Sequence, residues 1–297
     1  MRPISGSITA LVTPFRGGKV DEQAFEKLVD WQLRQGSHGL VICGTTGESP
    51  TLEYEEEDRL FDIALKTAAG RAPIIAGTGS NNTATAVERT KKAQDQGADA
   101  ALIVTPYYNK PTQEGLYQHY KAIHDSTSIP ILVYNIPGRC VVDILPPLMQ
   151  RLSQLPRIIG VKDATGDLSR PVRTRADCGE NFIQLSGNDD TAAAFLMQGG
   201  VGCISVASNV APALYAGFQN AWKQGNRAEF QRLRDLLDPL NRVLFVESNP
   251  SPAKYALSLL GLCTEEVRMP LIPCSLAAKE QVREVVQKLG LLKAKAA

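Results

Sequence analysis

Short apolar segments rich in β-branched residues recur along the chain, and the stretches between them have helical patterns. Eight of these segments are almost continuously apolar and do not alternate with polar residues, which is typical of parallel strands covered on both faces. They predict strands at 7–14, 39–43, 73–77, 100–106, 129–137, 158–164, 182–187 and 202–208.

The first intervening segment shows the signals that begin and end a helix. Asp21 is a residue type that caps helix N-termini, apolar residues then recur every three or four positions with one polar break at Gln32, and Gly36 follows as a stop. The other segments follow the same plan. Eight strand–helix units in succession predict an α/β fold, a (β/α)8 TIM barrel, rather than a doubly wound open sheet.

The chain continues beyond the eighth predicted strand with further helical patterns. One helix is enough to complete the barrel, so the sequence predicts a catalytic barrel domain over 1–224 and a C-terminal helical cap over 225–297. The helices expected in this region cover 212–224, 226–246, 252–261 and 275–290.

Charge and composition exclude several classes of partner. The 32 basic and 31 acidic residues give a formal charge of +1, which does not indicate binding to nucleic acid or to an anionic membrane. No apolar run reaches the roughly 18 residues that a membrane-spanning helix needs, so we expect a cytoplasmic protein. The six cysteines form no C-x-x-C pair, and the three histidines form no i,i+4 pair, so we expect reduced thiols and no bound metal.

In a barrel of this kind the chemistry is expected at the C-terminal ends of the strands, where Lys162 interrupts an apolar run. Desolvation penalises the charged form of an amine, so this position favours a free amine that attacks a carbonyl to form a Schiff base. A lysine that extends into a loop or pairs with Asp163 fits the pattern equally well. Gly160, on the same face of the strand, is interpreted as leaving empty space for a ligand beside Lys162.

Three further features lie at predicted strand ends. Residues 44–47 (GTTG) follow the second strand and form either an anion-binding turn or, as is commoner, an ordinary tight turn. Tyr134 is either a proton carrier near Lys162 or a core residue of its strand. Arg139, in the turn that follows, suits a carboxylate, although a surface arginine is the commoner outcome.

Five motifs in this order resemble the dihydrodipicolinate synthase family of bacterial lysine biosynthesis: GTTGES (44–49), TPYYNKP (105–111), YNIPGR (134–139), GVKDATGDLSR (160–170) and LSGND (185–189). More broadly, the chain is similar to the class I pyruvate aldolases and lyases, which include N-acetylneuraminate lyase. The GTTGE turn and the lysine strand are shared across that superfamily, and the PYYNKP and YNIPGR motifs are the specific part.

The resemblance implies a reaction and its catalytic residues. Lys162 would form a Schiff base with pyruvate and Tyr134 would move protons, with Thr45 and Tyr108 completing a hydroxyl relay. Because Tyr108 belongs to the paired subunit in such enzymes, a dimer would be the smallest complete unit, and a homotetramer built from dimers is expected. The implied reaction joins pyruvate to L-aspartate 4-semialdehyde to give 4-hydroxy-tetrahydrodipicolinate, with no cofactor besides the covalent Schiff base.

The resemblance also implies how the two substrates are held. The backbone N–H groups of Thr45 and Thr46 would bind the pyruvate carboxylate, and Arg139 would bind the carboxylate of the semialdehyde. Gly187 and Ile204 would line the pocket through their backbones.

A feedback site for L-lysine is often present at the dimer interface of the family. The matching positions here are Ser49, Pro50, Tyr54, Glu57, Asn81, Thr85 and Tyr107. Tyr54 replaces a residue that is often histidine, and Thr85 stands where an acid is expected, so one contact to the ammonium of the ligand is lost.

Two other functions stay open at this point. The first is a pyruvate-dependent aldolase or lyase acting on a sugar acid or another 2-oxo acid, against which Arg139 and Tyr108 argue. The second is a catalytically silent barrel that binds an amino acid at its interface and serves as a sensor or scaffold. The intact set of catalytic residues argues against it: Lys162, Tyr134, Thr45, Tyr108 and Arg139.

Overall fold

The computed structural model describes residues 2–292, and its strands form the barrel that the sequence predicts. Eight parallel strands follow one another around a closed barrel in the order β1-β10-β9-β8-β7-β6-β5-β4. These strands are β1 (Gly6–Ala10), β4 (Gly39–Ile42), β5 (Ile74–Gly77), β6 (Ala100–Val104), β7 (Ile131–Asn135), β8 (Ile158–Asp163), β9 (Ile183–Ser186) and β10 (Gly202–Ser205). The (β/α)8 fold class is therefore confirmed.

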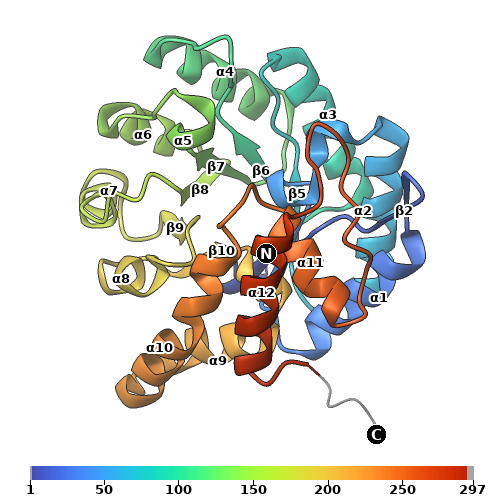
Figure 1. Cartoon of the computed structure of the whole chain (residues 1–297). Coiled ribbons are helices and arrows are strands. Elements are labelled where there is room, and N and C mark those ends of the chain that lie inside the picture. The colour runs from blue at the N-terminus through green and yellow to red at the C-terminus, as the bar shows by residue number, and fades with distance from the viewer. Residues whose placement is uncertain (1, 293–297) are drawn as a thin grey trace, which may run out of the picture. The chain divides into compact units, whose positions relative to one another are not determined.

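Helices connect the strands, and among residues 2–292 four helices follow β10 (Figure 1). The helices between strands are α1 (Glu22–Arg34), α2 (Tyr54–Ala68), α3 (Thr83–Gln96), α4 (Gln113–Ser126), α5 (Pro137–Cys140), α6 (Pro146–Ser153), α7 (Arg170–Cys178) and α8 (Ala192–Met197). The C-terminal helices are α9 (Pro212–Lys223), α10 (Arg227–Val243), α11 (Ser251–Leu259) and α12 (Leu276–Lys288). Each of the four expected C-terminal helices is present, and Met1 and residues 293–297 of the expected domains lie outside the described residues.

Several predicted strands are too long at their C-terminal ends. The first was expected to reach residue 14 and ends at Ala10, and the eighth was expected to reach residue 208 and ends at Ser205. Residues beyond these ends are buried and mostly apolar, but they pack in loops and in the short 3-10 helix Ala207–Asn209, so burial alone does not mark where pairing stops.

A small hairpin was not predicted. Strands β2 (Phe15–Arg16) and β3 (Lys19–Val20) pair antiparallel around Gly17 and Gly18, which both have positive φ. Two glycines between short strands are a known hairpin signal, but strands of two residues carry no periodicity to detect.

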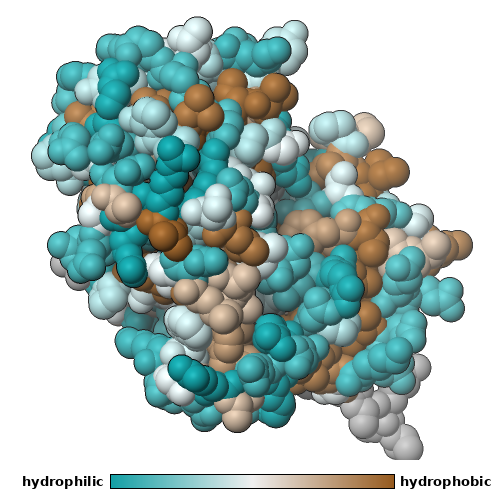
Figure 2. Space-filling model, turned by 90° about the vertical axis from the view of Figure 1, so that its left-hand side faces the viewer, coloured by the Kyte–Doolittle hydropathy of each residue, from teal (hydrophilic) through white to brown (hydrophobic). Residues whose placement is uncertain are grey.

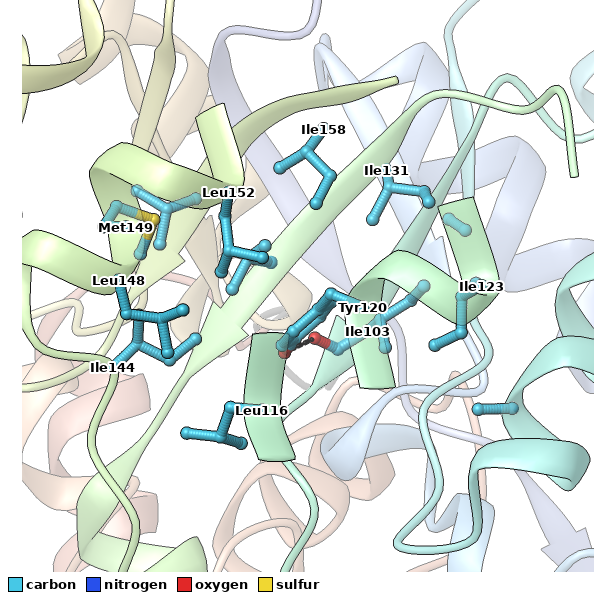
Figure 3. Packing of buried hydrophobic residues seen from close by; sticks show 14 of the residues in the cluster. Ile103, Leu116, Tyr120, Ile123, Ile131, Ile144, Leu148, Met149, Leu152 and Ile158 are labelled. Carbon is cyan, nitrogen blue, oxygen red and sulfur yellow. Dashed lines mark hydrogen bonds between the residues drawn. The ribbon is translucent and has the colours of Figure 1, made fainter. Parts of the chain in front are cut away.

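The described residues group into two compact parts, residues 2–6 with 73–204, and residues 7–72 with 205–292. In the first part, α4 and α6 pack against β6, β7 and β8 through a continuous apolar cluster (Figure 3). Tyr120 is fully buried at its centre, and its hydroxyl donates to the Ile103 carbonyl at 2.9 Å. This packing supports the strands that carry Tyr134 and Lys162.

In the second part, α1 begins and packs as the sequence predicts. Asp21 caps it by accepting from the Ala24 N–H at 3.0 Å, and Phe25, Leu28 and Val29 are buried. Gln32, the polar break in the pattern, is also buried, because its amide donates to the Ser208 and Asn209 carbonyls at 3.1 Å each. A buried amide with its hydrogen bonds made carries little desolvation penalty.

The surface in view is mostly polar. Figure 2 shows hydrophilic residues over most of the visible face, with hydrophobic residues in small groups among them. Among residues 2–292, no helix has both the length and the hydrophobicity that crossing a membrane requires.

Candidate functional site

Lys162 lies at the end of β8 and is only 6% exposed, and it faces the tyrosine on the neighbouring strand. Lys162 and Tyr134 are direct partners in the β7–β8 pairing, and the Lys162 Nζ lies 4.0 Å from the centroid of the Tyr134 ring. The two strands therefore bring together the amine and the phenol that the sequence singled out.

The pairing of Lys162 with Asp163 finds no support. Successive residues of a strand point to opposite faces, and the Asp163 carboxylate accepts from the Thr165 N–H and hydroxyl at 2.8 and 2.6 Å. Burial raises the pKa of Asp163, which the bonds from Thr165 and the charge of Arg170 oppose. Asp163 thus helps to hold the loop after β8.

The interpretation of Gly160 as open space beside Lys162 is wrong. A Cβ at this position would lie 2.3 Å from the Ile183 carbonyl oxygen and 2.6 Å from the Ile183 Cβ. Glycine is required here because β9 approaches β8 closely, and not because a ligand needs room.

Gly187 lies near the end of β8 as well. Its N–H donates to the Asp163 carbonyl at 2.6 Å, and a Cβ on it would lie 2.6 Å from the Ala164 Cβ. Ile204 is fully buried on β10, next to Cys203, which pairs with Ser186 of β9. The backbone of both expected lining residues thus lies at strand ends of the first part.

Arg139 lies on α5, the four-residue helix that directly follows β7, and its side chain is exposed. A polar network that sequence reasoning missed supports this loop. Buried Asn135 donates to the Asp143 carboxylate at 2.8 Å and accepts from the Ile144 N–H at 3.1 Å, and Arg170 also donates to Asp143. Only the fold brings these side chains together, so no local pattern marks them.

Tyr107 and Tyr108 lie in the loop after β6. Tyr108 is 89% exposed and has φ +69°, a left-handed conformation that is uncommon for a bulky residue. Asn109 ties this loop to the one before α3, because its N–H donates to the Tyr107 carbonyl and its side chain to the Asn81 carbonyl, both at 2.8 Å. Tyr107 and Asn81, two residues of the expected lysine site, therefore lie close together, with Thr85 half-buried in the first turn of α3.

In the second part, residues 44–48, here called the GTTGE turn, follow β4. Thr45–Gly47 form a 3-10 helix, and Glu48 adopts the left-handed conformation with φ +57°. Thr13 supports the turn by donating its hydroxyl to the Gly47 carbonyl at 2.7 Å. The first N–H groups of such a helix have no partner inside it, so those of Thr45 and Thr46 are available to an acceptor outside the helix.

The remaining residues of the expected lysine site follow this turn. Ser49 and Pro50 lie in a second 3-10 helix, Tyr54 is the exposed first residue of α2, and Glu57 is buried one turn later. These four positions thus gather at the start of α2.

A (β/α)8 barrel with a buried lysine at a strand end, in contact with a tyrosine ring, defines a class of protein, the barrel enzymes whose nucleophile is an amine. Residues 3–289 match the model of the dihydrodipicolinate synthetase family. The chain belongs to this family and is an enzyme.

Individual relatives agree with this assignment. The chain is 59% identical to the 4-hydroxy-tetrahydrodipicolinate synthase of Rhodospirillum centenum over 287 residues, which is 97% of this chain and 99% of that protein. It superimposes on the chloride-inhibited dihydrodipicolinate synthase of Acinetobacter baumannii in complex with pyruvate with a TM-score of 0.95, at 43% identity, covering 98% of this chain and 100% of that one. For the enzyme of Cyanidioschyzon merolae with lysine bound, the TM-score is 0.94 at 38% identity, covering 97% and 99%.

Proposed function

We propose that this chain condenses pyruvate with L-aspartate 4-semialdehyde to give 4-hydroxy-tetrahydrodipicolinate, the first committed step of lysine biosynthesis through diaminopimelate. The observation that carries the proposal is the buried Lys162 amine 4.0 Å from the Tyr134 ring centroid at the ends of two paired strands. The name of the Rhodospirillum centenum relative and the pyruvate in the Acinetobacter baumannii structure support it. The names of the relatives give no support to a sugar-acid aldolase.

The reaction begins at the Lys162 amine. It attacks the keto carbon of pyruvate, and the carbinolamine loses water to give an imine. Loss of a methyl proton gives an enamine, whose carbon attacks the aldehyde of the second substrate. The amino group of that substrate then attacks the imine carbon and releases the lysine, which closes the ring.

Tyr134 moves the protons in these steps. A phenol in contact with the amine is placed to give a proton to the carbinolamine hydroxyl as it leaves as water, and to take one back. Thr45 and Tyr108 complete the relay by the family resemblance. The 89% exposure of Tyr108 suits a side chain that enters the site of a second copy, so we propose a homotetramer built from dimers in the cytoplasm.

Separate groups bind the two carboxylates. The N–H groups of Thr45 and Thr46 bind that of pyruvate, and the Arg139 guanidinium binds that of the semialdehyde, for which its planar fork is well suited. Gly187 and Ile204 line the pocket. No metal and no cofactor other than the Lys162 Schiff base takes part.

L-Lysine is the proposed feedback ligand, bound by Ser49, Pro50, Tyr54, Glu57, Asn81, Thr85 and Tyr107. The lysine bound to the Cyanidioschyzon merolae enzyme supports this assignment, as does the short link between Asn81 and Tyr107 through Asn109. Glu57 supplies negative charge for an ammonium group.

Reduction of the protein with borohydride in the presence of pyruvate tests the proposal. We expect mass spectrometry to find a reduced pyruvate adduct on Lys162, and we expect turnover when the semialdehyde is added. Lys162→Arg keeps a long basic side chain but lacks a nucleophilic amine, and it should give neither. An adduct on another lysine, or none at all, would sink the Schiff-base assignment.

A further inference from the structure

The GTTGE turn is held by side chains more than two hundred positions later in the sequence. Lys254, on α11, donates to Glu48 Oε1 at 2.7 Å, and their side chains are 0% and 1% exposed. The Arg268 N–H donates to the other carboxylate oxygen at 2.9 Å. Both oxygens of Glu48 are therefore bound by the segment that follows α10.

Arg268 also holds the residues that follow the turn. Its guanidinium forms two bonds of 2.6 Å to the Glu56 carboxylate, and it donates to the Thr51 carbonyl at 2.7 Å. The Lys254 Nζ lies 4.1 Å from the centroid of the Phe15 ring, and the Arg268 guanidinium lies 4.4 Å from it. The two cations are thus packed and bonded on several sides.

Asn249 makes a second link to the turn. Its amide donates to the Thr46 hydroxyl at 3.0 Å, and both side chains are buried. Thr46 is one of the two residues whose N–H groups bind carboxylate in the proposed function.

Two physical arguments indicate that these contacts hold the GTTGE turn in one conformation. A buried ion pair contributes little net stability compared with an apolar pair of the same shape, because both ions lose their hydration. Glu48 also has a left-handed backbone, and a non-glycine residue stays in that conformation only where its surroundings determine it. The contacts of Glu48 supply such surroundings.

We propose that residues 249–268 position the GTTGE turn for substrate binding, with Glu48, Lys254 and Asn249 as positioning residues. None of the three touches substrate. They hold the turn so that the N–H groups of Thr45 and Thr46 meet the pyruvate carboxylate before Lys162 reacts. The inference rests on the proposed function for its consequence, but the restraint on the turn is independent of any reaction.

Two matched pairs of variants of the full chain test the proposal. Lys254→Met and Asn249→Ala each remove one link to the turn. Lys279→Met and Asn226→Ala are the controls, since Lys279 pairs with Glu265 at 2.7 Å and Asn226 caps α10 by accepting from the Glu229 N–H at 3.2 Å. The rate of backbone hydrogen exchange in the peptide over residues 43–52 measures how firmly the turn is held. The pyruvate concentration that half-saturates borohydride trapping measures the effect on substrate binding.

We expect both quantities to rise about fivefold in Asn249→Ala, which loses one neutral hydrogen bond, and about tenfold or more in Lys254→Met, which loses a charge-assisted one. In the controls both should stay at the parent values. Lys254→Met leaves the Glu48 charge buried, and the variant could fail to fold for that reason. The double variant Glu48→Gln with Lys254→Met then replaces it, because it removes both charges at nearly the same shape. We expect the exchange rate and the half-saturating pyruvate concentration to rise in the double variant as well.

The outcomes separate the two proposals. Unchanged exchange in the test variants, or an equal rise in the controls, overturns the positioning role. Faster exchange together with a parent protein that traps no pyruvate supports the restraint and contradicts the proposed function. Faster exchange with an unchanged pyruvate dependence shows that the turn is restrained but that this restraint does not serve substrate binding, which also overturns the proposal.

Discussion

At the scale of single residues, the surroundings of Lys162 decide its chemistry. Its amine contacts the Tyr134 ring, and it lies near enough to the buried Cys203 to affect the pKa of that thiol. Burial raises the pKa of the Cys203 thiol well above its usual range, Asp189 adds to this effect, and Lys162 opposes it. The aromatic ring in contact with the amine and the neutral thiol near it do not compete with it as nucleophiles.

Arg139→Ala tests whether the two carboxylates have separate binders. We expect the variant to form the pyruvate adduct as the parent does, and to lose about 1.5–3 kcal/mol of transition-state stabilisation with the semialdehyde, the value of a charge-assisted hydrogen bond. Steady-state kinetics in both substrates measures the loss. Arg173→Ala, at an exposed arginine on α7, is the control and should behave as the parent. Failure of Arg139→Ala to trap pyruvate would make Arg139 a structural residue.

We expect Thr85 to determine how strongly L-lysine binds in the proposed feedback site. A hydroxyl holds an ammonium less well than a carboxylate does, since charge-assisted bonds are roughly twice as strong as neutral ones. We therefore expect calorimetry to show weaker lysine binding to the parent than to Thr85→Glu. Thr85→Gln has nearly the same size without the charge and should not gain affinity. Equal affinity of all three proteins would mean that Thr85 does not face the ligand, and no heat from the parent would mean that the site is vestigial.

At the scale of elements, close approach between strands sets where glycine is required. The residues of β8 and β9 pair in parallel with Gly160 opposite Ile183, and the Ile183 backbone fills the space that a side chain at Gly160 would take. Since β8 also carries Lys162, a shift of this strand would move the amine relative to Tyr134.

Gly160→Ala is therefore expected to destabilise the protein by about 1–3 kcal/mol, the range for overpacking a well-packed interior. Urea unfolding measures the change. Gly138→Ala is the matched control, because a Cβ at Gly138 would meet no atom within 4 Å. Similar stability of the two variants would show that β9 yields to the added methyl group without cost.

At the scale of the whole molecule, buried titratable groups make the free energy of unfolding depend on pH. Burial lowers the pKa of His119 to about 4, whereas an unfolded histidine has a pKa of about 6.5. Between these values the unfolded chain binds a proton that the folded one does not, so stability falls as the pH drops through this window. The raised pKa of Asp163 acts in the opposite direction, because its folded state holds the proton more tightly.

His119→Gln isolates the histidine from the other groups. We expect the parent to lose about 1–2 kcal/mol more than the variant between pH 7 and pH 5, which urea unfolding at the two pH values measures. Glutamine also offers a polar group to Thr83, whose hydroxyl lies 2.9 Å from the His119 Nδ1. An equal pH dependence in both proteins would show that His119 titrates normally in the folded state.

Much of this protein follows from local patterns in the sequence. Continuous apolar runs predict the eight strands, because both faces of a parallel strand are covered, and the start of α1 at the Asp21 cap follows from its own hydrogen bond. Lys162 and Tyr134 stand out because a polar group at a barrel strand end is where such enzymes carry their chemistry.

Contacts between distant segments were decided only by the tertiary structure. Glu48 and Lys254 are 206 positions apart, and each by itself resembles an ordinary surface charge. Gly160 was misread for the same reason, since the atom that excludes a side chain belongs to Ile183 on the next strand. Periodicity and capping act over a few residues, whereas burial, pairing and close approach depend on which segments the fold places side by side.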